Sequence, residues 1–129
     1  MGSRLVILLD TNYLIRLLVA GTEEARRVDA WQDEGETLCT GSISWYEFLS
    51  GPVDAEAIEL VRSLIGGRIL PFVDDTAAET ARLFNAAGRV RRLRVDAMIA
   101  ATALLARARL ATENRSDFRM FAEPALELL

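Results

Sequence analysis

The sequence predicts an α/β domain, a three-layer sandwich in which helices cover both faces of a mostly parallel sheet. The run at residues 5–9 is continuously apolar, which is typical of a strand buried on both faces. Along the rest of the chain, short strand-like segments alternate with segments of helical periodicity, as in parallel sheets. The 129 residues, 51% of them hydrophobic, suffice for one core, so we expect a single domain over residues 1–129.

The expected strands are short apolar segments that end at polar residues or glycines. They span residues 5–9, 37–43, 69–73 and 110–112. Residues 124–129 are expected to form a terminal strand or tail.

The expected helices are bounded by capping residues and by glycines. Ser44 and Glu47 have the spacing of a capping box and predict a helix start, with a stop at Gly51. Asp75 or Thr76 is expected to cap the helix that ends before Gly88. The full set spans residues 10–21, 22–34, 44–51, 54–64, 75–87 and 95–108, with a helical turn at 116–118.

The composition excludes several kinds of catalysis. The chain has no histidine and no lysine, and all 15 basic residues are arginine. This removes Ser-His-Asp and Cys-His catalysis, histidine-ligated metals, the Walker A loop and Schiff-base chemistry. The single cysteine, Cys39, excludes disulfides and zinc ribbons and fits a reducing cytoplasm. If the protein is an enzyme, its catalysis must therefore rest on carboxylates, hydroxyls, arginines and a bound metal.

Acidic residues follow the expected strands or begin helices, where ligands of parallel sheets bind. For three of them, Asp10, Glu47 and Asp117, a helix cap is a competing interpretation. Asp96 begins a nearly all-apolar helix, where a carboxylate is costly unless it is paired or metal-bound. Converging carboxylates repel one another, and an oxygen-only ligand set selects Mg²⁺ or Mn²⁺.

The formal net charge of −4 hides a basic second half. Residues 1–65 hold five arginines against eleven acids, whereas residues 66–129 hold ten arginines against eight acids. Four arginines lie within six residues just before Asp96: Arg89, Arg91, Arg92 and Arg94. They are candidates for binding a phosphate backbone, and the alternative is that they only form a solvated turn.

At these residues the chain resembles the PIN-domain ribonucleases and, among them, the VapC toxins of bacterial toxin–antitoxin pairs. The first matching motif is Asp-Thr-Asn at residues 10–12, and the second is Ser-Trp-Tyr-Glu at 44–47. The third is Val-Asp-Ala-Met-Ile-Ala-Ala-Thr-Ala at 95–103, and the last is Thr-Glu-Asn-Arg-Ser-Asp-Phe at 112–118. Together the motifs extend over nearly the whole chain in the order and spacing of the family.

The resemblance implies a PIN-like α/β/α fold with four to five strands and a Mg²⁺- or Mn²⁺-dependent endoribonuclease. Such an enzyme hydrolyses RNA with a metal-activated water and leaves a 5′-phosphate and a 3′-hydroxyl. Asp10 and Asp96 match the acids most directly tied to the metal, and Glu47 matches the third. The fourth position is open between Asn114, which can offer a carbonyl oxygen, and Asp117. Two residues are expected to support the site: Thr112 and Asn12.

The resemblance also implies partners. VapC proteins form homodimers, and a VapB antitoxin covers an apolar groove beside the site; DNA is bound only through the antitoxin, and no membrane is involved. Candidates for this groove, for which core packing is the alternative, are Tyr13, Leu17, Leu18, Trp45, Phe48 and Leu49.

Two other functions compete with a toxin ribonuclease. One is a PIN-like RNA-binding module with weak or lost cleavage, which Asn114 leaves open. The other is a haloacid-dehalogenase-like phosphatase, which needs a second aspartate where this chain has Asn12 and a lysine that it lacks.

Overall fold

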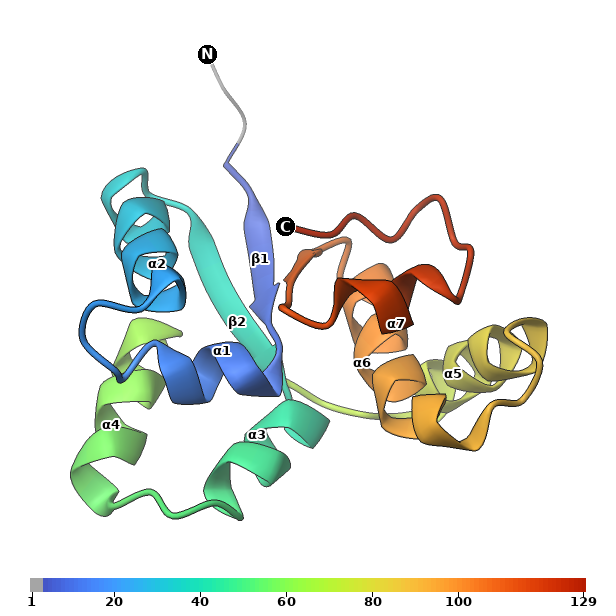
Figure 1. Cartoon of the computed structure of the whole chain (residues 1–129), viewed down its shortest axis with the longest axis horizontal. Coiled ribbons are helices and arrows are strands. Elements are labelled where there is room, and N and C mark those ends of the chain that lie inside the picture. Colours follow the sequence, from blue (N-terminus) through green and yellow to red (C-terminus); the bar gives the residue numbers. More distant parts are fainter. Residues whose placement is uncertain (1–3) are drawn as a thin grey trace.

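The sheet has four parallel strands in the order β3-β2-β1-β4, as seen in a computed structural model that describes residues 4–129. The first strand along the chain is therefore central, and its neighbours come from both halves of the sequence (Figure 1). The bounds are β1 Val6–Leu9, β2 Thr37–Gly41, β3 Ile69–Leu70 and β4 Arg109–Ala111. The C-terminal tail adds an isolated parallel bridge between Leu128 and Leu110. The α/β class and the parallel sheet are confirmed.

Helices cover both faces of the sheet, as the sequence predicts (Figure 1). The first face carries α1 Thr11–Arg16, α2 Glu23–Asp33, α3 Ser42–Leu49 and α4 Ala55–Leu64. The second face carries α5 Asp74–Ala86, the 3₁₀ turn Arg91–Leu93, α6 Arg94–Leu105 and α7 Arg115–Arg119. None of the helices within residues 4–129 has the length and apolar character needed to cross a membrane.

Successive side chains of the strands enter two different cores. In β1, Ile7 and Leu9 pack with α1–α4, whereas Leu8 packs with α5–α7. In β2, Leu38 and Cys39 divide in the same way. This alternation follows from the pleat of a strand, which sends neighbouring side chains to opposite faces. Ile7, Leu8 and Leu9 are buried on the two faces, which explains why this run is apolar, whereas Val6 at the start of the strand is 37% exposed.

The junction between β2 and α3 differs from the prediction. Residues 42 and 43 belong to the helix, and the cap is Gly41, which makes no side-chain hydrogen bond. Ser44 therefore lies inside the first turn, so the capping box that the sequence suggested is wrong. Its Oγ is the one buried side-chain polar atom without a hydrogen-bond partner among the described residues. A Cβ at Gly41 would lie 3.1 Å from Thr102 of α6, so the close approach of α6 favours glycine at this turn.

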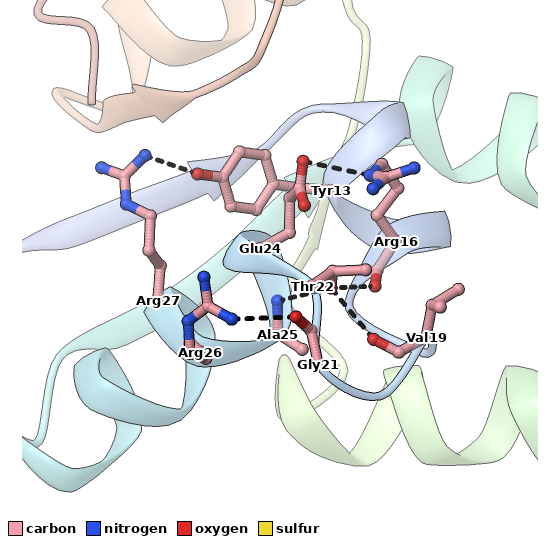
Figure 2. Close-up of polar contacts among 9 residues, drawn as sticks. All are labelled: Tyr13, Arg16, Val19, Gly21, Thr22, Glu24, Ala25, Arg26 and Arg27. Carbon is pink, nitrogen blue, oxygen red and sulfur yellow. Dashed lines mark hydrogen bonds and ion pairs between the residues drawn. The ribbon is translucent and has the colours of Figure 1, made fainter.

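The first predicted helix is shorter than residues 10–21, because it ends at Arg16 and the chain turns toward α2. Figure 2 shows how Thr22 closes this turn: its Oγ1 donates to the carbonyls of Arg16 (2.9 Å) and Val19 (3.0 Å) and accepts from the amide of Ala25 (3.1 Å). The buried Glu24 pairs with Arg16 at 3.2 Å. These contacts join α1, which begins directly after Asp10, to α2.

Three other boundaries also differ from the prediction. The strand predicted at residues 69–73 is only Ile69–Leu70, at the edge of the sheet. The next helix is capped at Val73, and Thr76 lies within its first turn, where its Oγ1 accepts from the Val73 amide at 3.2 Å. Helix α6 begins at Arg94 and ends at Leu105 instead of 108, and the chain then turns through Arg107, whose φ is 52°.

Candidate active site

Asp10 lies at the carboxyl end of β1, in the middle of the sheet, and is only 5% exposed. Its Oδ1 accepts from the amide of Thr11 at 2.7 Å, and its Oδ2 accepts from the hydroxyl of Thr112 at 2.7 Å. Burial raises the pKa of Asp10, the two hydrogen bonds oppose this, and the charge of Glu47 adds to it. Asp10 caps α1 and lies within the acidic site at the same time.

Glu47 reaches the same site from the middle of α3. Its Oε1 accepts a hydrogen bond of 2.7 Å from the hydroxyl of Thr11. Thr11 therefore holds both acids, through its amide on Asp10 and through its hydroxyl on Glu47. Its role was not predicted from the sequence, although Thr11 is the middle residue of the Asp-Thr-Asn motif.

Asp96 lies in the first turn of α6 and is half-buried. Burial first, and then the charges of Asp10, Asp117 and Glu47, raise the pKa of Asp96 to about 6, while Arg92 lowers it. Each of the other three predicted acids thus acts on Asp96. This electrostatic coupling indicates that acids from four separate segments of the chain surround one site.

Asn114 and Asp117 lie after β4 and complete the site. The Asn114 Nδ2 donates to Asp96 Oδ2 at 3.3 Å and to Asp117 Oδ2 at 3.1 Å, and its amide donates to Thr112 Oγ1 at 2.9 Å. Asp117 also forms an ion pair with Arg92, and the two bonds keep the pKa of Asp117 below its usual range. Asn114 therefore bridges two acids through its nitrogen.

The donor chemistry of these residues fits a hard divalent cation. Every side chain in the cluster offers oxygen, and a cation would relieve the mutual repulsion that adds to burial in raising the pKa of Asp96. Within residues 4–129, however, no three acidic or sulfur- or imidazole-bearing side chains are already placed to hold a metal ion. Asn114 would also have to turn its amide over to offer its carbonyl oxygen. The chemistry of these side chains is thus suitable for a divalent cation, although the side chains are not yet close enough together to coordinate one.

The four arginines of the basic run do not act as one group. Arg92 reaches Asp117, whereas the Arg94 guanidinium lies over the ring of Phe84, 5.7 Å from its centre. Arg89 and Arg91 are exposed. Asn12, expected to support the site, is exposed on α1, and its side chain makes no hydrogen bond within the described part of the chain.

The predicted apolar groove needs correction. Tyr13, Trp45 and Phe48 are buried core residues, because they point toward the sheet from α1 and α3. Leu17 and Leu18 are half-buried, whereas Leu49 is 42% exposed. The large apolar side chains that α1, α3 and α4 expose are Ile15, Tyr46, Leu49 and Leu60, and Val19 is exposed in the turn after α1.

We expect Thr112→Val to weaken both the fold and the site. Valine preserves the shape but leaves the buried Asp10 Oδ2 and the Asn114 amide without this partner. The predicted loss is about 1–3 kcal/mol in the free energy of unfolding, measured by urea denaturation. Thr112→Ser, which retains the hydroxyl, should recover most of it. Equal losses in the two variants would assign the effect to packing instead.

Comparisons with known proteins agree with this architecture. The family model described as "PIN domain" matches residues 7–124. A toxin–antitoxin complex from Klebsiella pneumoniae contains a chain 27% identical, with 93% of this chain and 94% of that chain covered and a TM-score of 0.72. FitAcB from Neisseria gonorrhoeae is 25% identical over 95% of this chain and 96% of that chain, with a TM-score of 0.70.

A third structure shares the fold at lower identity. VapBC2 from Rickettsia felis, bound to a DNA fragment from its promoter, is 19% identical over 97% of this chain and 98% of that chain, with a TM-score of 0.69. A search of the curated proteins found no match.

Proposed function

The chain belongs to the PIN-domain family, whose model matches residues 7–124, and from this premise we propose that it is a metal-dependent endoribonuclease and the toxin of a VapBC-type pair. The observation that carries the proposal is Asp96, a half-buried carboxylate whose pKa is raised to about 6 by burial and by three other acids. So much negative charge at the carboxyl end of a sheet favours a functional site that binds a divalent cation.

The proposed metal is Mg²⁺ or Mn²⁺, held by Asp10, Glu47 and Asp96, with Asn114 or Asp117 as a further ligand. Such a cation, when bound, supplies positive charge to the phosphate and lowers the pKa of a coordinated water. Thr11 and Thr112 keep the carboxylates of Asp10 and Glu47 in place through the hydrogen bonds described above. Because the chain has neither lysine nor histidine, its cationic contacts to RNA come from arginine, with Arg92 nearest to the acids.

The proposed partners are RNA as substrate, a second copy of the chain and a VapB-type antitoxin, in the cytoplasm. A matched structure at 27% identity, described as a toxin–antitoxin complex, supports the antitoxin as a partner. The exposed apolar side chains of α1, α3 and α4 offer a surface for the antitoxin. DNA would be bound through the antitoxin. We propose that the whole chain, 1–129, is one nuclease domain, of which residues 1–3 lie outside the described part.

Of the two competing functions, the phosphatase is excluded and the RNA-binding module is retained. Membership of the PIN family removes the phosphatase interpretation. An RNA-binding PIN module without cleavage remains a second candidate, because no three acids are preassembled within residues 4–129 and Asp117 is occupied by Arg92.

The test is cleavage of a labelled RNA panel with Mg²⁺ or Mn²⁺ by the wild type and by Asp10→Asn. Removing the charge of Asp10 should lower cleavage by about a hundredfold or more, because the site loses a central ligand. Asp29→Asn, on the exposed face of α2, removes the same charge away from the site and should cleave like the wild type.

Absence of cleavage with either ion, or equal cleavage by Asp10→Asn, would reject the nuclease. Expression of the same variants from an inducible promoter tests the toxin role separately from the nuclease activity. Growth should stop with the wild type and with Asp29→Asn, and it should continue with Asp10→Asn. Cleavage in vitro without growth arrest at verified expression would retain the nuclease and reject the toxin.

A further inference from the structure

We propose that Arg92 and Asp117 form an exchangeable pair, in which Arg92 neutralises the charge of Asp117 until an RNA phosphate replaces Asp117 as the partner of Arg92. Asp117 is then released toward Asp96 and the cation. This inference rests on the proposed nuclease function and assigns to it a substrate-linked step of site assembly.

The contacts of Arg92 place it at the rim of the site. One guanidinium nitrogen pairs with Asp117 Oδ1, and the other contacts Met120 Sδ at 3.2 Å. The Arg92 side chain is 56% exposed and that of Asp117 is 26% exposed, so a phosphate can approach Arg92 from solvent. Among the four arginines of the basic run, Arg92 is the one that pairs with a predicted acid within residues 4–129.

The two carboxylate oxygens of Asp117 have different partners: Oδ1 pairs with Arg92, and Oδ2 faces Asn114. Its Oδ2 accepts from Asn114 Nδ2, and that same nitrogen donates to Asp96 Oδ2. Asp117 is therefore separated from Asp96 by a single amide group, and its charge acts on Asp96. When the Arg92 contact is lost, this carboxylate lies beside the other acids without a cationic partner. The repulsion among the acids then increases, and so does the affinity of the site for a metal ion.

A phosphodiester is the ligand that this exchange fits. The planar guanidinium binds phosphate and carboxylate in the same forked geometry, so one can replace the other. An exposed ion pair contributes little net stability, so the exchange costs little.

The first test is a double-mutant cycle on Mn²⁺ binding, measured by titration calorimetry without RNA. Arg92→Gln should bind Mn²⁺ about fivefold more tightly than the wild type, because Asp117 is released. Asp117→Asn should stay within about twofold of the wild type, and the double variant should match Asp117→Asn. Arg91→Gln removes the same charge one position earlier and measures the general electrostatic effect.

The second test measures binding of the labelled RNA panel in EDTA. Asp117→Asn should bind more tightly than the wild type, because Arg92 becomes available, and this gain should vanish in the Arg92→Gln background. Glu113→Gln, an exposed acid nearby in sequence, is the control for lost negative charge.

The inference is overturned if Arg92→Gln binds Mn²⁺ no more tightly than Arg91→Gln, or if the double variant keeps the gain. It is equally overturned if the RNA gain of Asp117→Asn equals that of Glu113→Gln. Should neither the wild type nor any variant bind Mn²⁺, the metal site of the proposed function fails, and the inference fails with it. Normal Mn²⁺ binding without these differences rejects the exchange alone.

Discussion

An Asp96→Asn protein is expected to lose RNA cleavage by about a thousandfold while its folded state becomes more stable at neutral pH. Cleavage falls because Asp96 is the acid on which the charges of Asp10, Glu47 and Asp117 converge, and the proposed cation would lose a principal ligand. Stability rises because burial, and after it the same convergence of charges, make the ionised Asp96 unfavourable in the folded protein.

The direction of the pH dependence follows from the pKa of Asp96, which is about 6 in the folded protein against an ordinary value of 3.8. The folded state binds this proton more tightly than the unfolded chain does. The ionised carboxylate therefore destabilises the fold above about pH 6, and this cost disappears as the pH falls through the window between these pKa values. Asparagine carries no charge, so it removes a cost that exists only at the higher pH.

Thermal unfolding in EDTA at pH 7.5 and pH 4 measures this effect. At pH 7.5 the melting temperature of Asp96→Asn should exceed that of the wild type by about 3 °C, and the two should converge at pH 4. Asp29→Asn controls for the change in net charge. Adding Mg²⁺ should stabilise the wild type more than Asp96→Asn. A variant that melts lower at pH 7.5, or higher by the same amount at both pH values, would contradict the electrostatic account.

The sequence predicted the sheet well because its signal is local. A strand buried on both faces must be apolar at every position, and residues 5–9 satisfy this condition without reference to the rest of the chain. The helix ends were predicted less well, because tertiary contacts decide them. Ser44 has the pattern of a capping residue, yet the chain already turns at Gly41, beside Thr102 of α6.

The acidic residue types of the candidate site were visible in the sequence, but its connections were not. The bond from Thr11 to Glu47 joins residues 36 apart, and the pair of Arg92 with Asp117 joins residues 25 apart. No periodicity encodes such contacts, because they depend on how α3, α6 and α7 pack around the sheet. The run of four arginines likewise predicted a basic patch, and only the packing distinguishes Arg92 from its neighbours.

Helix α3 offers the second large effect, because two aromatic residues flank Glu47 in opposite environments. Phe48 is 0% exposed and packs against Trp45, with ring centres 5.4 Å apart, whereas Tyr46 is 68% exposed. We expect Phe48→Ala to lower the free energy of unfolding by about 3–5 kcal/mol, because it leaves a cavity under the helix. Tyr46→Ala should change it by less than about 0.5 kcal/mol. Urea denaturation monitored by circular dichroism measures both.

Comparing these variants distinguishes two roles of α3: its buried face positions Glu47, and its exposed face is the proposed surface for the antitoxin. A domain of this size has a total stability of about 5–15 kcal/mol, so Phe48→Ala removes a large fraction and loosens the helix that carries Glu47. Its cleavage should therefore fall together with its stability and recover partly with Phe48→Leu, which refills most of the cavity. Tyr46→Ala keeps the helix in place, so any loss of antitoxin binding in that variant reports the exposed surface. Similar stabilities for Phe48→Ala and Tyr46→Ala would show that α3 does not pack on the sheet through Phe48.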